Sequence, residues 1–174
     1  MNTLHICCPT RSDAQSILAF ESANRAYFEQ WINARDPSYY SLGAVRRAID
    51  EGNADREADR AYPFLVKQGD QLVGRVNFTA LARPYFNKAT IGYRIGEDWV
   101  GHGFASQAVE LALREAFGPL KLGRIEALVR SGNVGSARVL ERNGFVQFGL
   151  ARRSMLLDGV YHDLAYFERH AQPL

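Results

Sequence analysis

A glycine-rich loop between a strand-like segment and a helix-like segment limits the folds open to this chain. Residues 91–95 are mostly apolar, residues 101–106 read GHGFAS, and residues 107–113 follow a helical pattern. Glycines let the backbone approach a ligand closely, and the free N–H groups of a first helical turn attract anions. A second unit follows, an apolar run at 124–129 and a helix start at Asn133. Two such units in this order predict an enzyme that holds a phosphate-bearing cofactor and transfers a group from it.

The spacing of apolar residues predicts the rest of the fold. We expect strands near residues 4–8, 62–67, 71–78, 88–95, 124–129, 146–156 and 160–167, and helices near residues 12–32, 38–51, 103–117 and 133–143. Residues 68–70 and the pair Asp158-Gly159 favour tight hairpin turns. Neither a repeat nor a linker interrupts the pattern. We therefore expect one α/β domain over residues 1–174, with a mixed, mostly antiparallel sheet flanked by helices.

Composition and charge narrow the function classes. The net charge of +2 gives no argument for binding nucleic acid. No apolar stretch approaches the roughly 20 residues that span a membrane, and the chain starts without the pattern of a signal peptide, so we expect a cytoplasmic protein. Cys7 and Cys8 are the only cysteines, which excludes a disulfide framework. We expect one of them in the first strand, with a catalytic cysteine as the alternative.

Four motifs, in their order along the chain, resemble those of the GNAT acetyltransferase superfamily. They are IGYRI at 91–95, GHGFA at 101–105, Asn133 with Ser136, and Asn143-Gly144-Phe145. Within the superfamily the chain is similar to the ribosomal-protein N-terminal acetyltransferases, which act on a terminal alanine or serine, and the similarity covers nearly the whole chain. The resemblance implies the GNAT fold and an acetyl-CoA-dependent N-acetyltransferase, in which an amine attacks directly through a tetrahedral intermediate.

The resemblance also implies which residues bind acetyl-CoA. The backbone from Tyr93 to Gly96 would pair with the pantetheine arm, Asn133 would hydrogen-bond that arm, and the glycine loop would hold the pyrophosphate. Val100 departs from the family's loop, which begins with glutamine or arginine, although backbone N–H groups do most of the anion binding there. The expected cofactor-binding residues are Arg94, Ile95, Gly96, Gly101, His102, Gly103, Phe104, Ala105, Ser106, Asn133 and Ser136.

Three side chains near this site have two interpretations each. The His102 ring either contacts a phosphate or points to solvent while its backbone binds. Arg138 and Arg142 are four residues apart and share one helix face. They either meet the 3′-phosphate of the cofactor or are solvated.

The expected catalytic residues are Ser136 and Tyr93, and no metal is expected. By resemblance, Ser136 lies near the thioester sulfur and would protonate the departing thiolate. As an alternative, Ser136 caps the helix that starts nearby. Tyr93 either orders a water molecule in the cleft or belongs to the core.

A general base is not evident from the sequence. In one branch of the family a glutamate takes this role, and Met155 stands at the matching position here. Glu126 is a candidate, with an ion pair to a nearby arginine as the alternative. His162 and Asp163 adjoin the last hairpin, where strand alternation lets only one of them point inward. Loss of the amine proton to water is compatible with all of these, because an α-amine has a pKa of about 7.7–8.0.

The expected acceptor is the N-terminal α-amine of a protein or peptide, with a ribosomal protein as the leading candidate. A polyamine, an aminoglycoside or another small amine is the alternative. The acidity and width of the acceptor cleft distinguish the two, and we expect the helices around Tyr27 to Tyr40 and the loop Pro84-Tyr85-Phe86 to build that cleft. The charged segment at 50–60 is either a solvated helix end or an acidic rim that attracts an amine.

Two further hypotheses belong to other function classes. Gly101, Gly103 and Ser106 fall one residue short of the dinucleotide-binding fingerprint, and Glu126 lies near the distance expected for its ribose-binding acid. Glu126 is inside its strand, however, whereas that acid belongs at a strand end. Because Val100 and Met155 depart from the family's pattern, a non-catalytic protein that binds acyl-CoA as a sensor is a further alternative. We expect a monomer or a homodimer.

Overall fold

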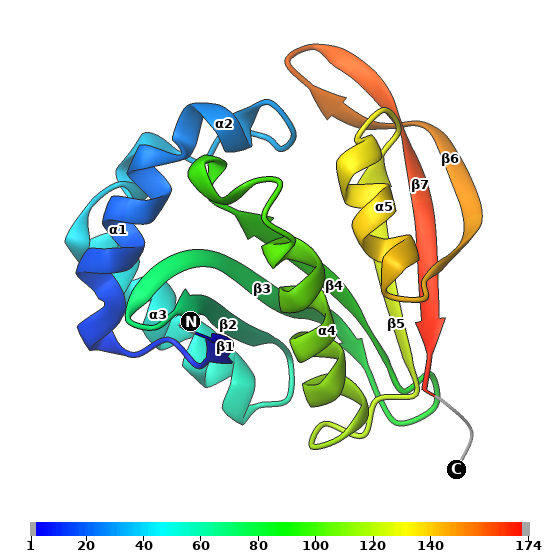
Figure 1. Ribbon diagram of the computed structural model, residues 1–174, viewed down its shortest axis with the longest axis horizontal. Helices are drawn as coiled ribbons and strands as arrows, with labels where there is room; N and C mark the ends of the chain where they lie inside the picture. The colour runs from blue at the N-terminus through cyan, green and yellow to red at the C-terminus, as the bar shows by residue number, and fades with distance from the viewer. Residues whose placement is uncertain (1–2, 172–174) are drawn as a thin grey trace.

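The computed structural model describes residues 3–171 and contains one seven-stranded sheet (Figure 1). The strands lie in the order β1-β2-β3-β4-β5-β7-β6, and all neighbours are antiparallel except β4 and β5. The predicted mixed, mostly antiparallel α/β architecture is therefore confirmed. The strands are β1 Leu4–Cys7, β2 Tyr62–Gln68, β3 Gln71–Ala82, β4 Lys88–Ile95, β5 Arg124–Arg130, β6 Val146–Leu157 and β7 Val160–His170.

Within the described residues, α-helices cover both faces of this sheet. They are α1 Ala14–Ala23, α2 Arg25–Glu29, α3 Leu42–Glu57, α4 Phe104–Phe117 and α5 Val134–Arg142, with short 3₁₀ turns at η1 Arg11–Asp13, η2 Pro37–Tyr39 and η3 Glu97–Trp99. Side-chain alternation along β2 shows how the core divides. Phe64 and Val66 join the larger apolar cluster under α4, whereas Leu65 packs with α1 and α3 on the other face.

The first two helical segments differ from the prediction. The segment predicted at 12–32 is divided at Asn24, which ends α1 and precedes α2. The Asn24 side chain donates to the Phe20 carbonyl and accepts from the Glu97 N–H at 2.7 Å. The helix predicted at 38–51 begins instead at Leu42, capped by the Ser41 hydroxyl, and continues to Glu57. Residues 50–57 are therefore helical, and no residue of the segment 50–60 lines the cleft described below, so the structure gives no support to an acidic rim.

Small residues let α4 lie close to the sheet. Val109, Ala112 and Ala116 of this helix are fully buried, while Ala105 lines the cleft described below. No helix in residues 3–171 is both long and apolar enough to cross a membrane.

The two parallel strands separate partway along their length. β4 pairs with β5 only from Lys88 to Thr90, while β5 continues to pair with β7 along its whole length. From Ile91 to Ile95, β4 keeps its partner β3 on one side but diverges from β5, so its other edge has no strand partner among the described residues (Figure 1). Backbone N–H and C=O groups along that edge are available to an extended ligand.

Candidate active site

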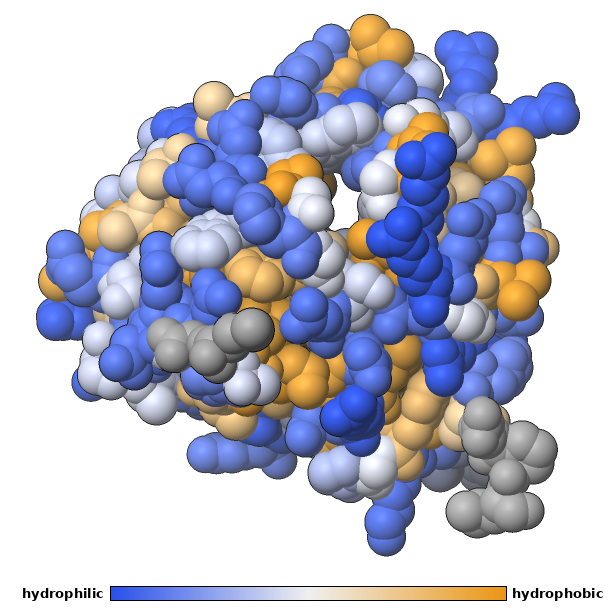
Figure 2. All heavy atoms as spheres, viewed as in Figure 1, coloured by the Kyte–Doolittle hydropathy of each residue, from blue (hydrophilic) through white to orange (hydrophobic). Residues whose placement is uncertain are grey.

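A cleft of about 930 Å³ opens where β4 and β5 separate. Figure 2 shows the surface hollowed to an opening between the start of α4 and α5. The walls come from β3, the end of β4, the glycine loop, the second half of β5, α5, and α2 with the residues that follow it. Segments far apart in the sequence therefore share one cavity.

The glycine loop has the backbone geometry of an anion site. Gly101 and Gly103 adopt left-handed φ values of +84° and +78°. Gly103 is the N-cap of α4, and no side chain in the described part of the protein caps this helix. The first N–H groups of α4 therefore remain free to bind an anionic ligand, which the positive end of the helix dipole also favours.

Side chains around the loop hold its shape. Trp99 stacks on Phe104, with ring centroids 5.5 Å apart. The His102 ring turns back to the Val100 carbonyl at 3.0 Å and does not line the cleft. Gly96 also lies outside the lining, and its N–H donates to the Val73 carbonyl of β3.

The other predicted cofactor-binding residues are brought together. Those that line the cleft are Arg94, Ile95, Gly101, Gly103, Phe104, Ala105, Ser106, Asn133 and Ser136. The Ser106 hydroxyl accepts a hydrogen bond from the buried Asn143 amide at 3.0 Å, which ties α4 to the end of α5.

Asn133, Ser136 and Tyr93 form one hydrogen-bonded group at the start of α5. The Asn133 carboxamide oxygen accepts from the Ser136 N–H at 3.0 Å, so Asn133 caps α5 and the alternative that Ser136 is the cap is wrong. The Ser136 hydroxyl instead lies 2.9 Å from the Tyr93 hydroxyl, which also contacts the Ser136 carbonyl at 3.1 Å. Burial raises the pKa of Tyr93 to about 12 and outweighs the hydrogen bond with Ser136, which lowers it. Tyr93 therefore stays protonated throughout the neutral and mildly alkaline range.

The charged residues that line the cleft are all arginines. They are Arg75, Arg94, Arg130, Arg138 and Arg142, and no acidic residue or histidine lines it among residues 3–171. Arg138 and Arg142 lie on α5, and Arg130 stacks over the Trp31 ring at 4.6 Å. Asn77 also lines the cleft.

Sequence reasoning missed Arg75, Asn77 and Arg130. A usable signal was present for the first two, because they alternate with the buried Val76 and Phe78 along β3. Strand alternation places such polar residues together on the opposite face.

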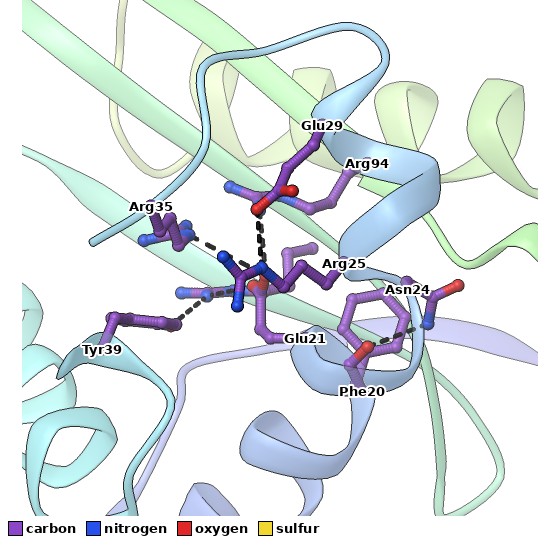
Figure 3. A network of polar contacts seen from close by, with 9 residues as sticks. Phe20, Glu21, Asn24, Arg25, Glu29, Arg35, Tyr39 and Arg94 are labelled. Carbon is purple, nitrogen blue, oxygen red and sulfur yellow. Dashed lines mark hydrogen bonds and ion pairs between the residues drawn. The ribbon is translucent and has the colours of Figure 1, made fainter. Parts of the chain in front are cut away.

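A buried carboxylate on α1 organises three arginines. Glu21, which is 1% exposed, pairs with Arg75 at 2.8 Å and Arg94 at 3.0 Å, and Arg35 lies 3.9 Å away (Figure 3). Tyr39 accepts a further hydrogen bond from Arg75 at 3.4 Å. Burial, reinforced by Arg35 and Arg75, lowers the pKa of Arg94 below its ordinary value despite Glu21. One carboxylate thus faces three guanidinium groups.

The candidate bases outside this cluster have other partners. Glu126 contacts Lys88 at 3.0 Å and Arg124 at 2.8 Å, which confirms the ion-pair interpretation. Asp163 accepts from the Arg153 N–H at 2.7 Å, and neither Asp163 nor His162 lines the cleft. Met155 does line it. Burial raises the pKa of the Cys7 thiol, and neither cysteine reaches the cleft, so the structure gives no support to a catalytic cysteine.

Of the two segments expected to build the acceptor cleft, only one lines the cavity. Tyr27, Phe28, Trp31 and Ile32 line the cavity, as expected for the segment that begins at Tyr27. The loop Pro84-Tyr85-Phe86 does not, because it joins the end of β3 to the start of β4, opposite to the end where β4 meets the glycine loop. Tyr85 is 95% exposed there.

A family model described as an acetyltransferase (GNAT) domain matches residues 4–146. The chain belongs to the GNAT acetyltransferase family. The probable N-acetyltransferase YjcK of Bacillus subtilis is 38% identical over 154 residues, which cover 87% of this chain and 85% of that protein. The [ribosomal protein uS5]-alanine N-acetyltransferase of Escherichia coli is 28% identical over 153 residues, covering 87% and 79%.

The GNAT fold is also shared with solved structures. Mycobacterium smegmatis RimJ, solved in complex with CoA-disulfide, superposes with a TM-score of 0.90 at 24% identity and covers 97% of this chain and 82% of that one. The GNAT fold implied by the sequence motifs is therefore confirmed, and the protein is an acetyltransferase. This result removes the dinucleotide-binding hypothesis.

Proposed function

We propose that this enzyme transfers the acetyl group of acetyl-CoA to the N-terminal α-amine of a protein, with a ribosomal protein as the leading acceptor. The observation that carries this proposal is the chemistry of the cleft, which offers five arginines and, in the described residues, no carboxylate or imidazole as a base. The relatives support it, since one acts on the alanine of ribosomal protein uS5. A ribosomal-protein acceptor would place the enzyme in the cytoplasm, the compartment that the sequence predicts.

Acetyl-CoA, which supplies the activated thioester, fits the cofactor half of the cleft. Gly101, Gly103 and the first turn of α4 offer N–H groups to the pyrophosphate. The free edge of β4 from Ile91 to Ile95 offers a backbone partner to the pantetheine arm. Arg138 and Arg142 line the same half and suit the 3′-phosphate.

The arginines explain how an amine becomes a nucleophile without a protein base. Only the neutral amine attacks a thioester carbonyl, and nearby positive charges disfavour the ammonium form. An α-amine starts with a pKa of about 7.7–8.0, whereas a lysine side chain starts at about 10.4. A modest further lowering is enough for the α-amine, and its proton then passes to water.

The same charges argue against polycationic acceptors. A polyamine or an aminoglycoside is recognised by carboxylates, and the described part of the cleft has none. The observation therefore favours an acceptor with a single amine over the small-amine alternative.

We assign Ser136 and Tyr93 to the leaving sulfur. The protonated Tyr93 hydroxyl lies 2.9 Å from the Ser136 hydroxyl and 3.1 Å from the Ser136 carbonyl. In the arrangement in which Tyr93 donates to either oxygen and the Ser136 O–H turns to the sulfur, Ser136 donates to the departing thiolate. A hydrogen bond to a charged group contributes about 1.5–3 kcal/mol.

Ser136→Ala is expected to lower kcat by about 10- to 100-fold while the Kd for acetyl-CoA changes much less. The reason is that the hydroxyl acts on charge that develops only as the sulfur leaves. Steady-state kinetics and calorimetric titration with acetyl-CoA measure the two quantities. Ser154→Ala is the control, because Ser154 is exposed on β6 and outside the cleft lining. An unchanged kcat in Ser136→Ala would remove this role.

The pH profile tests the absence of a protein base. We expect kcat/KM to rise to the pKa of the free acceptor amine, and kcat to rise with a lower apparent pKa, because the arginines act on the bound amine. Neither kcat nor kcat/KM should decrease as the pH rises to about 10. The raised pKa of Tyr93 keeps its phenol protonated beyond the pH at which an ordinary tyrosine begins to ionise. A bell-shaped kcat profile with both limbs between pH 6 and 9 would contradict the proposal.

A further inference from the structure

The Glu21 cluster carries more positive charge than its own carboxylate balances. Arg75, Arg94 and Arg35 surround Glu21, which leaves two positive charges uncompensated within the cluster. The Nε atoms of Arg75 and Arg35 are buried and have no hydrogen-bond partner within the described residues. Buried guanidinium groups are normally satisfied, so the excess positive charge and the unused Arg75 donor favour an anion as a further partner of the cluster.

The cluster is open to the cleft. Arg75 and Arg94 both line the cavity, and their side chains are 14% and 20% exposed. Arg94 also lies over the Phe28 ring at 5.3 Å, which fixes its stem while its guanidinium group remains in contact with Glu21. Glu21 thus holds one guanidinium group on each carboxylate oxygen, Arg75 on Oε1 and Arg94 on Oε2. Figure 3 shows Arg94 and Arg35 around Glu21.

Strand register places this pair two residues from Asn77, whose side chain suits the acceptor amine. Arg75 faces Arg94 across β3 and β4, and Asn77 faces Gly92 one step along the same face. A Cβ built on Gly92 would meet nothing within 4 Å, so the space above it is open. The Asn77 carboxamide oxygen is buried without a hydrogen-bond partner in residues 3–171 and suits an amine N–H. Two residues along a strand span about 6.6 Å, which is the expected distance along the sheet from the Asn77–Gly92 pair to the Arg75–Arg94 pair.

We propose that Arg75 and Arg94 bind a carboxylate of the acceptor, and that this carboxylate is the acidic side chain of the second residue of the acceptor protein. This inference rests on the proposed function and names the class of N-terminus that it prefers. The spacing supports this inference. One Cα–Cα step of about 3.8 Å plus the length of a side chain spans the distance from the acceptor amine to the two arginines. The α-carboxylate of a free amino acid is too close to its own amine to do so.

The experiment compares peptides that begin with serine and differ only at the second residue, which is glutamate, glutamine or lysine. With the wild-type enzyme we expect kcat/KM to be about 10-fold higher for the glutamate peptide than for the glutamine peptide, and lowest for the lysine peptide. The preference should shrink as salt is added. A free amino acid and its amide form a separate arm.

A variant links the preference to the cluster. Arg94→Gln should reduce the glutamate-to-glutamine ratio to below about 3-fold, whereas Arg114→Gln, which removes an exposed arginine on α4, should leave it unchanged. The ratio compares two peptides on one enzyme, so a loss of folded protein in Arg94→Gln does not alter it.

The outcomes separate the inference from the proposed function. Equal kcat/KM for the glutamate and glutamine peptides would overturn the inference and leave N-terminal acetylation standing. A preference that survives in Arg94→Gln would also overturn it. Acetylation confined to a free amino acid, with no acetylation of its amide or of any peptide, would overturn the proposed acceptor class. It would also overturn the proposal that the arginines bind an acidic side chain.

Discussion

Gly103→Glu is expected to lower the affinity for acetyl-CoA by about 1,000-fold or more. The new carboxylate would stand at the N-terminus of α4, where the pyrophosphate is proposed to bind, and like charges in contact cost several kcal/mol. Gly103 also holds φ at +78°, a value that L side chains rarely adopt. Calorimetric titration with acetyl-CoA or coenzyme A measures the change in Kd.

The control separates loss of the anion site from backbone strain. Gly159→Glu places the same side chain at nearly the same φ, +76°, in the β6–β7 turn, where a Cβ meets nothing within 4 Å. Both variants should lose a similar amount of stability, about 1–2 kcal/mol for a left-handed residue, but only Gly103→Glu should lose the cofactor. Wild-type affinity in Gly103→Glu would show that the pyrophosphate binds elsewhere.

Glu21→Gln is expected to lower the free energy of unfolding by about 3–5 kcal/mol. The amide keeps the shape of the side chain but leaves Arg75, Arg94 and Arg35 facing one another without a counter-charge. Urea denaturation should show a lower midpoint with an unchanged m-value, because the surface exposed on unfolding is the same.

Glu110→Gln is the matched control for this stability change. It removes the same charge from an ion pair with Arg114 whose side chains are 57% and 70% exposed, and such pairs contribute at most about 1 kcal/mol. Similar midpoints for the two variants would show that the Glu21 cluster does not organise the fold.

Local patterns determined the elements that the sequence predicted well. β4 was expected at residues 88–95 and spans Lys88–Ile95, because alternation and flanking turns define a short strand. The turn at Asp158-Gly159 has the two left-handed φ values, +47° and +76°, that this dipeptide favours. Residues of the glycine loop and the start of α5 were likewise correctly placed in one cleft, since both are short motifs.

Long-range contacts explain what the sequence did not predict. The break at Asn24 depends on its bond to the Glu97 N–H, 73 residues away, which no helical periodicity reveals. The pairing of Glu21 with Arg75 and Arg94 spans 54 and 73 residues. The loop at 84–86 was misplaced for a simpler reason, because β4 runs from that loop to the glycine loop, so the two must lie at opposite ends of the strand.

Acetyl transfer to a defined amine tests the proposed function most directly. The measurement is thiol release from acetyl-CoA with peptides that begin with serine, alanine, threonine or methionine, an N-blocked lysine peptide, spermidine and an aminoglycoside, followed by mass spectrometry to locate the acetyl group. We expect turnover only with the free α-amine peptides, with the acetyl group on the first residue. Turnover confined to spermidine or the aminoglycoside would contradict the proposed acceptor, and binding of acetyl-CoA without turnover of any amine would contradict catalysis at this cleft.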